Sequence, residues 1–75
     1  MATMELQRTP AEELAAAGEA LRAARAEFRN WAAHCDRMLA DPEDAAAIAW
    51  QARRSALIVQ ALLDEAEVCT MAARG

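Results

Sequence analysis

A single break divides this sequence into two long segments with helical periodicity, and no other feature constrains the fold as strongly. The break is the run Ala40-Asp41-Pro42-Glu43-Asp44. Pro42 disfavours helical geometry at Asp41, whereas Asp41 can cap a following helix that has proline in its first position. A connection this short makes the two helices antiparallel neighbours. The sequence therefore predicts an all-α fold, an antiparallel two-helix hairpin similar to a coiled coil.

The first segment, about residues 10–40, begins with a capping box. Thr9 suits the cap, Pro10 suits the first helical position, and Glu12 can reach back to Thr9. A stripe with heptad spacing follows, made of Leu14, Ala17, Leu21, Ala24, Phe28, Trp31, Cys35 and Met38. Because this spacing keeps side chains on one helix face, we expect the stripe to pack against the second helix, with Leu14 opposite Ala66.

The second segment, about residues 42–72, carries apolar residues on two opposite faces. The inner stripe is Ile48, Ala52, Ser55, Val59, Leu62 and Ala66, flanked by Ile58 and Leu63. The second stripe is Trp50, Leu57, Ala61 and Val68, about 180° away at about 100° per residue. In a two-helix protein one face of this helix packs on its neighbour, so the other needs another chain. We therefore expect a partner or homodimerisation to complete the hairpin.

Length and composition also favour a partner. Hydrophobic residues make up 56% of the 75 residues, but 22 residues are alanine, which favours helix and adds little burial. Chains of this size usually gain stability from disulfides, metals or partners. Cys35 and Cys69 would lie roughly 30 Å apart in the hairpin, beyond disulfide reach, and we interpret them as buried free thiols. Residues 1–8 carry no clear period and are expected to form a flexible arm, which leaves 9–75 as a single domain.

The charge pattern argues against nucleic-acid and membrane roles. The net charge is −4 and all eight basic residues are arginine, so we expect no nucleic-acid binding. No apolar run approaches the roughly 18 residues that a membrane span needs. The start MATMELQRTP lacks the basic and apolar regions of a signal peptide, and we expect a cytoplasmic location.

Residues that could carry chemistry are few. His34 is the only histidine, and its helical neighbours are not usual zinc ligands, so we expect no metal site. The sequence has no serine elbow, phosphate loop or Cys-x-x-Cys motif, so we predict neither an enzyme nor a cofactor. One enzyme class stays open, a small helical mutase that holds a dianion with arginines and needs a third helix or a dimer to close its pocket. The candidates are Arg22, Arg25, Arg29, Arg53 and Arg54.

Trp50 is the candidate anchor of a partner interface, because it is rigid, large and amphipathic. Trp50 could instead fold over the turn or the flank of the hairpin. The stripe that it forms favours the interface, since exposed patches of this kind mark partner sites. The predicted partner-binding residues are Trp50, Arg53, Arg54, Leu57, Ala61 and Val68.

A family resemblance rests on Trp50-Gln51, an arginine at Arg53 or Arg54, and Ser55-Ala56-Leu57 followed by an aliphatic run. With these residues and its layout of a charged start and two long helices, the chain resembles the small E-type co-chaperones of the Ysc-class type III secretion apparatus. It departs from them in its high alanine content and acidic tail. The resemblance implies a cytoplasmic hairpin that pairs with a tetratricopeptide-like chaperone, and together the two hold the needle subunit unpolymerised before export.

A second function stays open, a homodimeric four-helix bundle with a structural or regulatory role. Its second stripe would pack on its own copy. A further hypothesis concerns Asp64, Glu65 and Glu67, which approach the end of the second helix, where the dipole favours cations. Only Arg74 is basic there, so we expect this acidic end to meet basic residues of a partner.

Overall fold

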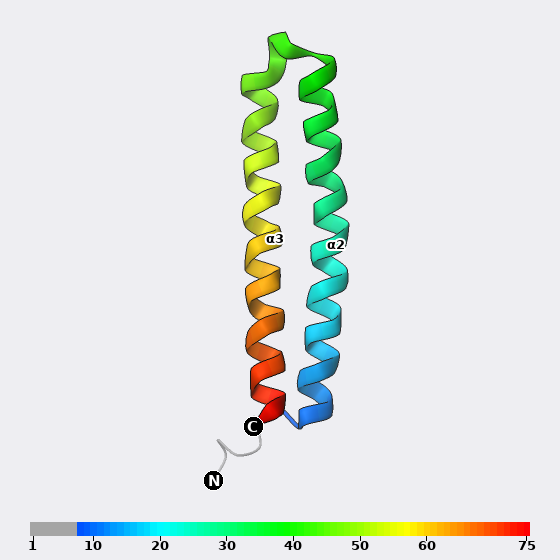
Figure 1. Cartoon of the computed structure of the whole chain (residues 1–75), viewed down its shortest axis with the longest axis vertical. Helices are drawn as coiled ribbons and strands as arrows, with labels where there is room; N and C mark the ends of the chain where they lie inside the picture. The colour runs from blue at the N-terminus through cyan, green and yellow to red at the C-terminus, as the bar shows by residue number, and fades with distance from the viewer. Residues whose placement is uncertain (1–7) are drawn as a thin grey trace.

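The structure is a computed structural model that describes residues 8–75 as two long helices joined by a tight turn (Figure 1). Helix α2 spans Pro10–Ala40, the 3-10 helix η1 spans Pro42–Asp44, and helix α3 spans Ala45–Arg74. The two long helices run antiparallel and pack against each other along their length. The chain is therefore the all-α helical hairpin that the sequence predicts. The expected arm over residues 1–8 lies, apart from Arg8, outside the described residues.

The predicted capping box forms at the start of α2. The Thr9 side-chain oxygen accepts a hydrogen bond from the Glu12 backbone N–H at 3.1 Å, and the Thr9 backbone N–H donates to Glu12 Oε1 at 2.8 Å. These two bonds satisfy backbone donors that have no partner within the helix. Beside them, Arg8 Nε lies 4.0 Å from Glu13 Oε1. Local side-chain chemistry thus determines where α2 begins.

The capping box makes the stability of the hairpin depend on pH in the acid range. The pKa of the Glu12 carboxyl lies below its ordinary value because the backbone and then the side chain of Thr9 hydrogen-bond to Glu12, with a smaller contribution from the Arg8 charge. A carboxyl with a lowered folded-state pKa stabilises the fold above its unfolded-state pKa, and this stabilisation is lost as pH falls through the folded-state pKa. We therefore expect the melting temperature, followed by circular dichroism, to fall on acidification.

Glu12→Gln separates this effect from general acid denaturation. Glutamine keeps the hydrogen bond to Thr9 but does not titrate, so the fall in melting temperature is expected to be smaller in this variant. Glu19→Gln, in the first half of α2, is the matched control and is expected to follow the wild type. An unchanged pH profile in the Glu12→Gln variant contradicts the prediction.

The turn differs from the predicted arrangement at Asp41. The Asp41 backbone N–H donates to the Arg37 carbonyl at 2.9 Å, which closes the end of α2. The Asp41 side chain makes no capping bond to η1, and the Asp44 side chain makes none to α3. The expectation that Asp41 caps the second helix through its side chain is therefore wrong. The reason is that Pro42–Asp44 forms a separate 3-10 turn, so Asp41 serves as the last cap of α2.

The contact between the two helices consists mainly of small side chains. The buried residues are Ala17, Ala20, Ala24, Ile48, Ala52, Ser55, Ala66 and Cys69. On α3 this agrees with the predicted inner stripe, in which Val59 and Leu62 are half-buried. Small residues at the contact allow two helix axes to approach closely. The hairpin is therefore closed by close backbone approach rather than by bulky apolar side chains.

Helix α2 buries two members of the predicted heptad stripe, Ala17 and Ala24, together with Ala20. Its buried residues are alanines, whereas Leu14, Leu21 and Phe28 are 55%, 46% and 54% exposed. The expectation that these bulky residues fill the contact with α3 is wrong. Turning the alanines toward α3 rotates the three bulky residues, which share one helix face, onto a flank of the hairpin.

The expected pairing of Leu14 with Ala66 does not occur in the buried core of the hairpin. Ala66 clusters with Ala17, Ala20 and Cys69, not with Leu14. Both cysteines are free thiols; Cys69 is buried, as predicted, and Cys35 is half-buried.

Candidate partner interface

Most large apolar side chains of the described chain are exposed. They are Leu14, Leu21, Phe28, Leu39, Trp50, Leu57, Ile58, Leu63, Val68 and Met71. Among residues 8–75, Ile48 is the one large aliphatic side chain in the buried set. The radius of gyration is 17.0 Å, against about 11 Å for a compact domain of this length. The hairpin by itself therefore leaves an unusual amount of apolar surface in water.

The outer face of α3, formed by Trp50, Leu57, Ala61 and Val68, is one such surface. Trp50 is 75% exposed, Leu57 is 55% exposed and Val68 is 65% exposed, and Ala61 is exposed as well. The alternative in which Trp50 folds over the turn or the flank does not occur, because three quarters of its surface remains open. The spacing of these residues places them on the side of α3 opposite the contact with α2.

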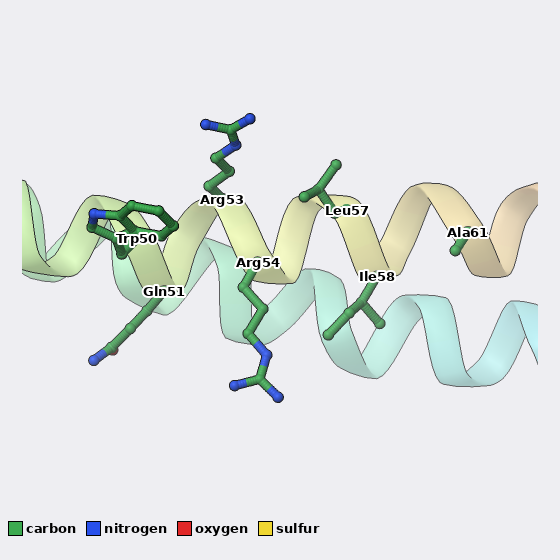
Figure 2. A pocket seen from close by; sticks show the side chains of 7 residues that line it. All are labelled: Trp50, Gln51, Arg53, Arg54, Leu57, Ile58 and Ala61. Carbon is green, nitrogen blue, oxygen red and sulfur yellow. The ribbon is translucent and has the colours of Figure 1, made fainter.

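Five of the six predicted partner-binding residues line one shallow hollow on α3 (Figure 2). These are Trp50, Arg53, Arg54, Leu57 and Ala61. The sixth, Val68, lies outside the hollow, about two turns beyond Ala61. In Figure 2, Arg53 and Leu57 project to the side of α3 away from α2, whereas Arg54 projects to the other side. The hollow is thus an apolar centre with an arginine at each edge.

Two further residues line the hollow that sequence reasoning missed, Gln51 and Ile58. Gln51 Oε1 accepts a hydrogen bond from Arg37 Nη1 at 3.3 Å, and this bond connects the hollow on α3 to helix α2. Arg37 Nη1 also lies 3.5 Å from His34 Nδ1. The spacing of seven residues between Gln51 and Ile58 puts them on one line of α3 between its two stripes, and this spacing is the signal that could have found them.

A second apolar surface, here called the lateral groove, lies between the helices on one flank. Its apolar lining is Leu21, Ala24, Phe28, Val59 and Leu63, and Arg25 and Arg29 complete it. Sequence reasoning missed this groove because it placed the bulky residues of α2 in the contact with α3. The structure also separates the candidate arginines, since Arg53 and Arg54 line the hollow on α3. The five arginines thus do not meet in one pocket.

The composition of the outer face suits binding to a protein surface. Tryptophan and arginine are among the residues that most often dominate interface energetics, and Trp50, Arg53 and Leu57 line the same hollow. In the part of the chain that the structure describes, no group of three or more His, Cys, Asp or Glu residues could hold a metal ion. What the hollow can do chemically is bury an apolar side chain and donate hydrogen bonds from two guanidinium groups.

No protein-family model, curated protein or solved structure matches this chain. Neither α2 nor α3, the long helices of residues 8–75, combines the length and apolar character needed to cross a bilayer. The class that the structure defines is a helical hairpin with two exposed apolar surfaces.

Proposed function

We propose that this chain is a non-enzymatic, cytoplasmic protein-interaction module, a type III secretion co-chaperone that stabilises a tetratricopeptide-like chaperone holding the needle subunit before export. The observation that carries the proposal is the outer face, where Trp50 is 75% exposed on a hairpin whose own contact is built from small residues. Trp50, Gln51 and Arg53, which carry part of the resemblance to the E-type co-chaperones, line the same hollow.

The mechanism is capping of an incomplete helical array. A helical-repeat chaperone has an open end whose apolar face lacks a neighbouring repeat. The outer face of α3 covers that end, with Trp50 filling an apolar pocket and Arg53 and Arg54 meeting carboxylates at the rim. Binding to the folded chaperone stabilises it by mass action. The stabilised chaperone then covers the helical surface through which the needle subunit polymerises.

A second candidate function is a homodimeric four-helix bundle with a structural or regulatory role. The observation that favours it is that exposed bulky residues lie on both helices, for example Leu14 and Phe28 on α2 and Leu57 on α3. A four-helix bundle buries a face of every helix, and a two-fold dimer uses the same patch on both copies. Self-association through these residues needs no other protein.

Co-expression of the full chain with a tetratricopeptide-like chaperone and a needle subunit tests the proposal. We expect a discrete complex by size exclusion with light scattering, and a sharper melt at higher temperature by circular dichroism than for the chain alone. Failure of the chain to bind the chaperone contradicts the co-chaperone role. A sharp dimer of the chain alone, with a cooperative and concentration-dependent melt, supports the four-helix bundle instead.

A further inference from the structure

We infer that the lateral groove binds an amphipathic helix of a partner protein, one whose apolar heptad stripe is edged by carboxylates. The inference rests on the proposed function as an interaction module and adds a second binding surface, separate from the outer face of α3. The groove and the hollow on α3 have no lining residue in common.

Both helices build the floor of the groove. Leu21 and Phe28 come from α2, and Val59 and Leu63 come from α3. Leu21, Phe28 and Leu63 are each about half exposed, at 46%, 54% and 47%. The Phe28 ring is held against the Trp31 ring, with centroids 5.4 Å apart. A third helix laid in this groove contacts α2 and α3 together and completes a three-helix bundle.

The spacing along the groove defines the period of the occupant. Leu21 and Phe28 in the lining lie seven residues apart, and Leu14, which is exposed beyond the lining, continues the same spacing. At 1.5 Å per residue the three residues span about 21 Å, or roughly four helical turns. A helix with its own heptad repeat keeps its apolar residues aligned with such a row, whereas a strand or an irregular peptide does not.

The charges at the groove favour a partner helix with carboxylates along its edges. Arg25 and Arg29 line it, and no carboxylate does, although the whole chain carries a net charge of −4. The two arginines are four residues apart on one helix, where like charges repel. Within residues 8–75 the salt bridge formed is Arg8 with Glu13, so neither groove arginine is paired. Carboxylates along the edge of a partner helix relieve this repulsion and form charge-assisted hydrogen bonds.

Two synthetic peptides test the inference with the full chain. Both carry the same leucine heptad stripe over three heptads; one has glutamate at the flanking positions and the other has lysine. Fluorescence anisotropy of the labelled peptides measures their affinities. We expect the glutamate-edged peptide to bind at least about tenfold more tightly, with a difference that shrinks at high salt. Equal binding of the two peptides overturns the inference.

Charge reversal at the groove gives the decisive comparison. The R25E/R29E variant is expected to reverse the peptide preference, while R37E/R74E, which changes the net charge equally, is expected to keep it. Phe28→Ala, which keeps the charges, is expected to weaken binding of the glutamate-edged peptide at least about tenfold. Circular dichroism checks that each variant keeps its helicity. If R37E/R74E reverses the peptide preference as strongly as R25E/R29E does, the inference is overturned.

Light scattering on the chain alone tests the other possible occupant of the groove, a second copy. If wild type is a dimer and R25E/R29E is a monomer, a second copy fills the groove and the inference is overturned. Failure of this inference is distinct from failure of the proposed function, because binding to the chaperone is assigned to the outer face of α3. The R25E/R29E variant is expected to bind the tetratricopeptide-like chaperone as well as the wild type does.

Discussion

Replacing Trp50 and Leu57 together with alanine is expected to weaken the complex with a tetratricopeptide-like chaperone by at least about 100-fold. Both side chains are more than half exposed in the hairpin, so their loss removes little that holds α2 and α3 together. In the complex they are the bulky anchors of the outer face, where truncation typically costs about 2 kcal/mol or more per residue. Isothermal titration calorimetry with the purified chaperone measures the loss.

A matched control for this variant is available on the same hairpin. Leu39 and Met71 are 82% and 63% exposed and lie outside the hollow on α3 and the lateral groove. The double change of Leu39 and Met71 to alanine removes exposed apolar surface without touching the proposed interface, so the affinity is expected to stay within about twofold of wild type. A folded Trp50→Ala, Leu57→Ala variant that binds as well as this control contradicts the assignment of the outer face.

Ala24→Leu is expected to destabilise the hairpin by about 1–3 kcal/mol. Ala24 is 3% exposed in the contact between α2 and α3, so a leucine there forces the two backbones apart along neighbouring turns. A loss of this size is a large fraction of the stability of a small domain. Urea unfolding followed by circular dichroism, at one protein concentration for all variants, measures it.

The neighbouring position supplies the control for this substitution. Ala23 is exposed on α2, and leucine is a good helix former, so Ala23→Leu is expected to change stability by no more than about 0.5 kcal/mol. The pair of variants reports which face of α2 meets α3. Stabilisation by Ala24→Leu contradicts the close alanine contact and favours a hairpin with a wider, bulkier core.

Local signals in the sequence were sufficient to predict the hairpin and the exposed outer face. Thr9 and Glu12 form their capping box from residues three apart, and Pro42 interrupts the helix through its own ring and missing N–H. The two stripes of α3 follow from helical periodicity, because an inner stripe on one side leaves Trp50 on the other. The sequence of α3 alone was therefore sufficient to predict six candidate residues, five of which line the hollow.

The tertiary structure decided which face of α2 packs against α3, and with it the lateral groove. The heptad stripe of α2 contains small and bulky residues, so its period alone is compatible with a bulky core and with a close alanine contact. Which arrangement forms depends on the side chains that α3 presents, among them Ala52, Ser55 and Ala66. Small residues on both helices allow close backbone approach, and that approach displaces Leu21 and Phe28 to the flank. Helix formation is a property of each segment, whereas the contact face is a property of the pair.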